Sequence, residues 1–290
     1  MESAYAKRSM NAMRPLLGTY VRIIVHSEPT ESAATSAMHA QAIEAAFAAI
    51  ALVQKQMSAF SPDSDLGRIR RLAHLEPVTV HPWTQDVIDL AQSLHTQSEG
   101  LFDPGIAPQL ASWGVLPANL EKFGNTARSS IMQLTVQDGR VRSATPCHID
   151  LGGIAKGFAV DRAIDALKVC GISSASVNAG GDLRVIGPAP EPIYVRQPYG
   201  SEPVFAGLLQ DGACATSAIY YSLRAHGGHT ISALVNPHNH QPLLCPDSFS
   251  VIAPVCAVAD ALTQVLALSR NIALPCFAHY GAQPFITAST

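Results

Sequence analysis

Two glycine pairs lie close together in this sequence, and they limit how the backbone around them can run. Residues 150–161 read DLGGIAKGFAVD, and residues 178–182 read NAGGD. Glycine adopts positive φ angles at little cost and lets a backbone approach a ligand closely. Lys156 follows the first pair and can meet a phosphate, which the N–H groups at a helix N-terminus also attract. The unit therefore indicates a nucleotide or phosphate site.

The spacing of these glycines excludes two common phosphate-binding motifs. The G-x-G-x-x-G pattern of dinucleotide-binding folds is absent, and no G-K-[ST] follows, as a P-loop requires. Each glycine pair taken alone is also compatible with a tight turn that binds nothing. Two pairs joined by a single crossover favour the ligand site over the simple turn.

Segments typical of strands and of helices are mixed along the chain, and we expect an α+β fold. Their β-branched and apolar residues predict strands at residues 19–25, 174–177, 183–186 and 250–255, and a hairpin at residues 129–150. Spacings of three and four residues predict helices at residues 32–60, 84–98, 157–170 and 257–268. The last helix would carry Asp260 in its first turn. Residues 61–65 and 100–117 read as loops, the second either structural or in contact with a ligand.

Composition excludes several functional classes. The 290 residues carry a formal charge of −3 and only 14% are charged, so we expect no surface for nucleic acid. Six cysteines are scattered singly, without metal or redox spacing, which predicts reduced thiols. No run approaches the roughly eighteen apolar residues of a membrane span, and residues 1–15 lack the apolar stretch of a signal peptide. We expect a cytoplasmic protein without a membrane span.

Residues 150–161 and 178–182 together resemble the signature of the FAD:protein FMN transferase family, often called the ApbE type. Further segments resemble family elements and follow in the family's order: residues 16–19, 57–66, 100–108, 215–217 and 259–263. The resemblance implies one ApbE-like domain over residues 14–290, preceded by a flexible N-terminus at residues 1–13. It also implies a duplicated, T-fold-like architecture in which a flavin cleft lies between two intertwined halves.

The resemblance further implies roles for individual residues around FAD. The residues expected to contact this cofactor are Leu17, Phe60, Leu101, Phe102, Asp103, Asp150, Lys156, Asn178, Gly180, Gly181, Thr216 and Ser217. The expected ligands of a Mg²⁺ ion are the carbonyl of Gly153 and the side chains of Asp260, Thr263 and Gln264. Asp260 and Asn236 are the expected catalytic positions.

The reaction that the resemblance implies moves FMN from FAD to a second protein. A Thr or Ser hydroxyl of an acceptor flavoprotein attacks the phosphorus on the FMN side, and AMP leaves. A hard cation with oxygen ligands neutralises charge on the pyrophosphate oxygens. Catalysis of this kind depends mainly on positioning and electrostatics.

The sequence departs from the family pattern at three positions of the expected site. A histidine and an aspartate of the family correspond to Ala233 and Asn236, and a threonine beside the metal corresponds to Gln264. Histidines near the missing imidazole in the sequence are His226, His229, His238 and His240, although residues 238–240 also suit a polar turn. Three activities therefore stay open: FMN transfer, hydrolysis of FAD to FMN and AMP, and flavin binding or carriage without catalysis.

Overall fold

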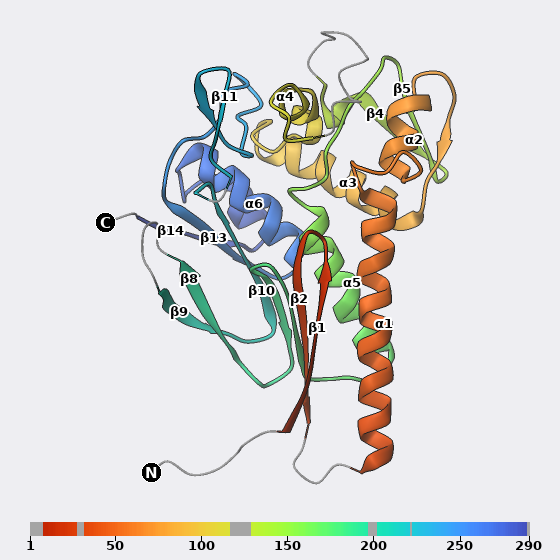
Figure 1. Cartoon of the computed structure of the whole chain (residues 1–290), viewed down its shortest axis with the longest axis vertical. Helices are drawn as coiled ribbons and strands as arrows, with labels where there is room; N and C mark the ends of the chain where they lie inside the picture. The colour runs from red at the N-terminus through yellow and green to blue at the C-terminus, as the bar shows by residue number, and fades with distance from the viewer. Residues whose placement is uncertain (1–7, 28–31, 117–128, 197–201, 221, 289–290) are drawn as a thin grey trace.

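A seven-stranded antiparallel sheet forms the centre of the molecule (Figure 1). The computed structural model describes residues 8–27, 32–116, 129–196, 202–220 and 222–288. In pairing order the strands are β1 (Arg8–Leu16), β2 (Thr19–Ser27), β6 (Ala175–Ala179), β7 (Asp182–Ile186), β10 (Gly212–Ala218), β13 (Ser248–Ala253) and β14 (Gln283–Thr287). Because pairing order equals chain order, the other described elements lie in connections between neighbouring strands.

Two helices lie side by side on one face of the sheet, and a third packs against the first of them. The helix α5 (Ala155–Val169) contacts β6 and β7, and α6 (Cys256–Ser269) contacts β10 and β13. The long helix α1 (Ala33–Met57) runs along α5 (Figure 1). Its buried side includes Ala42 and Ala46, whose small side chains let two helices approach closely. This layer holds most of the apolar core.

A hairpin covers part of the opposite face of the sheet. It consists of β8 (Glu191–Arg196) and β9 (Pro203–Leu209). Side chains alternate along a strand, so Leu183 and Val185 of β7 point to this hairpin and form a second apolar cluster with Ile193 and Val195. The sheet is therefore buried on both faces around β7 and β10.

A smaller part of the protein sits beyond one end of the sheet. It holds α2 (Asp65–Leu72), β3 (Val78–Thr79), α3 (Pro82–Gln97), the 3₁₀ turn η1 (Pro104–Ile106), α4 (Ala107–Ser112), the 3₁₀ turn η3 (Ile131–Gln133), β4 (Leu134–Gln137) and β5 (Arg140–Ser143). Buried Asp65 joins α2 to α3 by accepting hydrogen bonds from the His81 backbone N–H and the Thr84 hydroxyl. The remaining elements are β11 (Arg224–His226), β12 (His229–Ile231) and α7 (Pro275–His279).

The α+β fold class is confirmed, and so are the predicted strands and long helices. The hairpin of β4 and β5 turns at Asp138 and Gly139, both with positive φ. All six cysteines are free thiols, as expected.

Three predictions about loops and helix starts were wrong. Residues 100–117 are not a plain loop, because they contain η1 and α4, each with a proline in its first turn. The loop predicted at residues 61–65 ends one residue early, since Ser64 caps α2 at Asp65. Asp260 lies just beyond the first turn of α6, which begins at Cys256. The sheet also includes residues 8–13, expected to be flexible, whereas residues 1–7 lie outside the described part.

One of the described helices, α1, has the length and apolar composition of a membrane span. The helix meets this test by its mean hydropathy, because polar residues such as His39 and Glu44 interrupt its apolar residues. In the structure one side of α1 is buried, including Phe47, Ile50 and Val53. That burial is typical of a core helix.

The two central helices approach each other closely at a glycine. A Cβ on Gly157 would overlap the backbone carbonyl of Cys256, at the N-terminus of α6. The third glycine of the DLGGIAKG unit is therefore required by helix packing. Gly152 and Gly153 precede α5 and do not lie at this contact between the helix backbones.

We predict that Gly157→Ala destabilises the protein by about 1–3 kcal/mol, because the added methyl forces α5 and α6 apart. Alanine has the higher helix propensity, so without this overlap the substitution would stabilise. The measurement is the urea midpoint. Gly212→Ala is the control, since a Cβ there meets only ordinary contacts, the nearest 3.5 Å away. A variant as stable as the parent would contradict the packing constraint.

Candidate active site

A cavity of about 990 Å³ lies between the central sheet, the β8 strand and the smaller part of the molecule. Its size is at the upper end of the roughly 300–1,000 Å³ typical of small-molecule sites. The predicted site residues that line it are Phe102, Asp103, Asp150, Gly153, Lys156, Asn178, Gly180, Gly181, Thr216, Ser217, Asp260 and Gln264. Residues from distant parts of the sequence thus converge on one cavity, as the sequence predicted.

The second glycine pair forms one wall of the cavity as the turn between β6 and β7. Gly180 and Gly181 have φ angles of 64° and 110°, and the Asn178 side chain accepts a hydrogen bond of 3.0 Å from the Gly181 N–H. A Cβ on Gly180 would overlap the Thr19 side chain. These glycines therefore serve both a tight turn and a close approach to β2.

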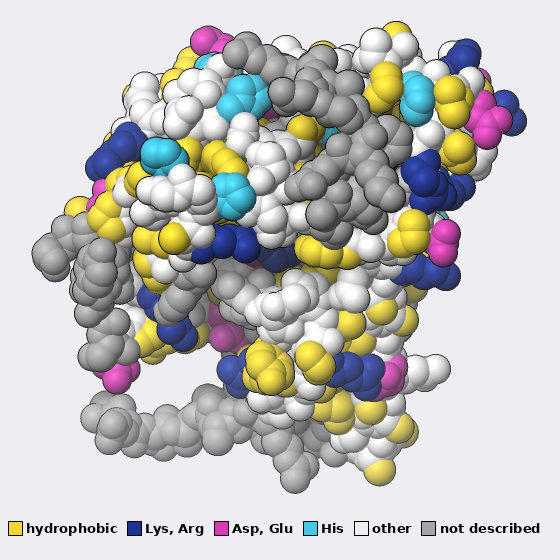
Figure 2. Space-filling view, turned by 45° about the horizontal axis from the view of Figure 1, so that its top comes forward, with side chains coloured by type: hydrophobic (Ala, Val, Ile, Leu, Met, Phe, Trp, Pro, Cys, Tyr) yellow, Lys and Arg dark blue, Asp and Glu magenta, His cyan; other side chains and the backbone are white. Residues whose placement is uncertain are grey.

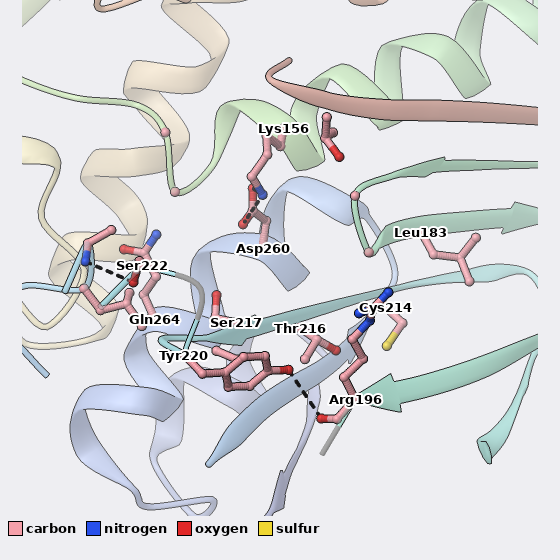
Figure 3. Close-up of a pocket in the computed structure, with 18 of the residues that line it drawn as sticks. Lys156, Leu183, Arg196, Cys214, Thr216, Ser217, Tyr220, Ser222, Asp260 and Gln264 are labelled. Carbon is pink, nitrogen blue, oxygen red and sulfur yellow. Dashed lines mark hydrogen bonds and ion pairs between the residues drawn. The ribbon is translucent and has the colours of Figure 1, made fainter. Parts of the chain in front are cut away.

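Two charged side chains, Lys156 and Asp260, meet at the cavity wall (Figure 3), and a third, Asp182, pairs with the lysine. The Lys156 ammonium donates to the Asp182 carboxylate and lies 3.4 Å and 3.5 Å from the two carboxylate oxygens of Asp260. The Asp260 carboxylate also accepts the Gly157 N–H, at 3.1 Å. Asp182 and Asp260 are almost fully buried, whereas Lys156 is 37% exposed. The lysine is therefore the member of the triad most open to a ligand.

Burial and mutual charge set the protonation of this triad. Burial raises the pKa of Asp260 to about 7, with a further contribution from the charge of Asp182 and a partial offset from Lys156. Burial alone would lower the pKa of Lys156, but the charges of Asp182 and Asp260 hold it above its ordinary value. The ammonium therefore stays charged near neutral pH while Asp260 titrates there.

Hydroxyl groups continue the site from β10 to α6. The Thr263 hydroxyl donates to the Asp260 carbonyl at 2.6 Å and is 2.7 Å from the Ser217 hydroxyl. Since the proton of Thr263 is used, Ser217 must donate in that pair, which leaves its lone pairs for the cavity. Thr263 is fully buried and does not line the cavity. The predicted metal ligand Thr263 is thus a support, and the oxygen that faces the cavity belongs to Ser217.

Oxygen donors suited to a hard cation lie beside the triad. Gln264 packs so closely against Gly153 that a Cβ there would overlap the Gln264 amide. Among the described residues, no group of three or more His, Cys, Asp and Glu side chains could hold a metal ion. Mg²⁺, however, is usually bound by one or two carboxylates together with substrate phosphates and water. The chemistry of Asp260, Gln264 and Ser217 fits that mode.

Four of the expected cofactor or catalytic residues do not line the cavity: Leu17, Phe60, Leu101 and Asn236. Leu17 has a positive φ of 56° and donates its N–H to Gln54, and Phe60 is 67% exposed. Asn236 holds a turn, in which its side chain accepts the His238 N–H at 2.9 Å. The polar-turn interpretation of residues 238–240 is therefore the one that the structure supports.

None of the four candidate histidines lines the cavity. His226 and His229 are exposed on β11 and β12, and His238 lines a separate, smaller cavity, where it contacts the Glu99 carbonyl. Histidine side chains are visible on the molecular surface in Figure 2. Ala233 does line the large cavity. Within the described residues, the cavity wall at this position therefore carries no imidazole.

Several lining residues were missed by sequence reasoning. They include Thr19, Tyr194, Arg196, Cys214, Tyr220 and Ser222. Tyr194 and Arg196 come from β8, whose sequence has no motif, and the Tyr220 hydroxyl donates to the Arg196 carbonyl (Figure 3). Only Thr19 lay in a segment singled out beforehand.

Comparison with known proteins gives a consistent picture. The model of the ApbE family matches residues 17–278. The FAD:protein FMN transferase of Vibrio cholerae is 29% identical over 226 residues, which cover 72% of this chain and 68% of the relative. That of Rhodobacter capsulatus is 30% identical over 204 residues, which cover 66% of this chain and 39% of the relative.

Solved structures show the same fold. The ApbE protein of Thermotoga maritima superposes with a TM-score of 0.80, at 27% identity and with 97% of each chain covered. The flavin transferase ApbE of Vibrio cholerae gives a TM-score of 0.77 at 23% identity, with 98% of each chain covered. These similarities confirm the ApbE-like architecture expected from the sequence.

We predict that Asp260 makes the protein less stable as pH rises from about 4 to 7. In that window the folded state keeps a proton that the unfolded state releases, so unfolding becomes easier as pH rises. The free energy of unfolding differs between about pH 4 and pH 7, and Asp260 contributes about 1–3 kcal/mol to that difference. Asp260→Asn should remove this contribution. Thermal unfolding against pH, without flavin or metal, measures it. Asp165→Asn, at a partly exposed position of α5, should keep the parent slope. An unchanged slope in Asp260→Asn would contradict the raised pKa.

Proposed function

The chain belongs to the ApbE family, and on that premise we propose that it is an FAD:protein FMN transferase. It would move FMN from FAD onto a Thr or Ser hydroxyl of an acceptor protein and release AMP. The observation that carries the proposal is Lys156, held by Asp182 and Asp260 at the wall of a cavity of flavin-nucleotide size. The lysine cation favours a pyrophosphate.

FAD would occupy the large cavity, with its pyrophosphate next to Lys156. The exposed part of that ammonium faces the cavity, and its two carboxylate partners hold it in place. Polar contacts would come from residues on opposite walls: Asp103, Asp150, Asn178, Thr216 and Ser217. Apolar contacts would come from Phe102 and Leu116 on the side of the smaller part. The combination suits a ligand with rings and phosphates.

Mg²⁺ would be held by Asp260, Gln264, the Gly153 carbonyl and Ser217. When bound, such an ion supplies positive charge to the pyrophosphate oxygens. Gln264 supplies a neutral oxygen, which adds no charge, so Lys156 and Asp260 set the electrostatics of the site. Asp260 must be ionised to bind the ion. Because its pKa is raised to about 7, it is ionised only near neutral pH and above.

The acceptor hydroxyl would lose its proton without help from a histidine. Ala233 stands at the wall where the family imidazole is expected. The described residues that line the cavity include no histidine. A dissociative phosphoryl transfer makes little demand on a base, because the attacking oxygen bonds late. Alignment of the hydroxyl and neutralisation of charge by Lys156 would then carry the reaction.

The missing imidazole is also the observation that favours a second candidate, a flavin-binding or carrier protein that does not cleave FAD. Hydrolysis of FAD by water at the same phosphorus is the third possibility. The three differ only in what happens after FAD has bound. They are therefore separable by their products.

When the protein is incubated with FAD and Mg²⁺, we expect the release of AMP to depend on an added acceptor protein and on Asp260. AMP with covalent flavin on the acceptor indicates transfer, AMP without acceptor indicates hydrolysis, and bound FAD without AMP indicates a carrier. Chromatography of nucleotides and in-gel flavin fluorescence measure these products. Asp260→Asn should reduce AMP release at least about a hundredfold, as the loss of an electrostatic catalytic group does. Asp165→Asn, on α5 but outside the cavity lining, should not change AMP release, and equal turnover in both variants would refute the assignment of Asp260.

We expect Lys156→Met to weaken FAD binding about tenfold, since a charge-assisted hydrogen bond to phosphate is lost. Quenching of flavin fluorescence on titration measures the dissociation constant. Lys168→Met is the matched control, because Lys168 lies on the same helix but at its exposed far end. An unchanged dissociation constant for Lys156→Met would show that Lys156 does not contact the pyrophosphate.

A further inference from the structure

The N-terminus of α6 is capped by a residue from another helix. Its own N-cap residue, Val255, makes no side-chain hydrogen bond. Instead, the carboxylate of Asp161 on α5 accepts the N–H groups of Cys256 and Ala257, at 2.8 Å and 2.9 Å. These are two of the first N–H groups of α6, which have no partner inside the helix. The start of α6 is therefore defined by α5.

The reverse contact joins the same two helices. The N-cap residue of α5, Ile154, also makes no side-chain hydrogen bond. Near that end, the Gly157 N–H donates to the carboxylate of Asp260 on α6, at 3.1 Å. Each helix therefore receives an acidic cap from the other, and in each the acidic residue lies about one turn beyond the capped end.

The two capping carboxylates differ in their surroundings. Asp161 is paired with Arg184 of β7, at 2.5 Å, and does not line the cavity. Asp260 lines the cavity beside Lys156. One member of the reciprocal pair is thus locked between helices and sheet, whereas the other faces the ligand site.

We propose that Asp161 is a positioning residue, which fixes the N-terminus of α6 and so holds the Asp260 carboxylate in place for the flavin nucleotide. This inference rests on the proposed function, because it concerns the same site. Asp260 follows the capped residue Ala257 by three positions, within one rigid turn of helix. A shift of that turn by about 1 Å would break the contact with Gly157 and separate Asp260 from Lys156.

A double-mutant cycle on FAD binding tests the proposal. Asp161→Asn keeps the shape of the side chain but removes the charge and one acceptor position. If Asp161 acts through Asp260, the substitution should weaken FAD binding with Mg²⁺ about tenfold in the parent, as loss of a supporting residue does. In the Asp260→Asn background the same substitution should change the dissociation constant less than about twofold, since the route of its effect is absent.

Two further variants serve as checks. Asp165→Asn makes the same chemical change on the same helix, where the residue pairs with Arg162 alone at 2.7 Å, and should leave FAD binding unchanged. Arg184→Met loosens Asp161 without removing the cap, and it replaces Asp161→Asn if that variant fails to fold. Arg184→Met should lower the affinity for FAD less than Asp161→Asn does, and this effect should also disappear in the Asp260→Asn background.

If Asp161→Asn lowers FAD affinity equally in the parent and in the Asp260→Asn background, the proposal is overturned, because Asp161 would then act on the fold as a whole. An unchanged FAD affinity on Asp161→Asn in the parent would overturn it as well. Failure of the proposed function has a different outcome, namely that the parent protein itself does not bind FAD. That outcome overturns the positioning role together with the proposed function, whereas the outcomes above overturn the positioning role alone.

Discussion

The crossing of α5 and α6 is the constraint on which the rest of the structure depends. The helices touch where Gly157 leaves room for the Cys256 carbonyl, and at that point each helix caps the other. Because helix ends carry partial charge and unpaired N–H groups, two buried ends side by side would be unfavourable without acidic partners. Asp161 and Asp260 supply them. The ligand cavity opens directly beside this junction, so packing and electrostatics are fixed by the same few residues.

The cavity is built more for holding charge than for transferring protons. Two buried carboxylates and one ammonium lie within hydrogen-bonding distance, and the described walls contain no imidazole. Buried charges of this kind persist only when they are paired and hydrogen-bonded, as these are. An enzyme with this site depends on alignment of its substrates. Ala233, which lines the cavity, adds no titratable group to it.

Much of the site was predictable because glycine requirements and motif order are local properties of the sequence. The walls formed by residues 150–157 and 178–182 were identified in this way. Local patterns failed where tertiary contacts decide. The start of α6 is set by Asp161, so Asp260 lies later in the helix than expected. Pro104 and Pro108 read as loop residues, yet each lies in a first helical turn, where a missing N–H costs nothing. Tyr194 reaches the cavity only because its hairpin folds over the sheet.

The walls of the cavity also bear on how the protein folds. Thr19 and Gln264, near opposite ends of the sequence, line the same cavity, and the strands between them pair in chain order. Contacts so distant in the sequence form slowly, because a long loop must close before they contribute. The site is therefore incomplete in any partly folded state that lacks either Thr19 or Gln264 in its native place. A nucleotide that binds there selects the fully folded chain and raises its stability in proportion to the logarithm of the ligand concentration.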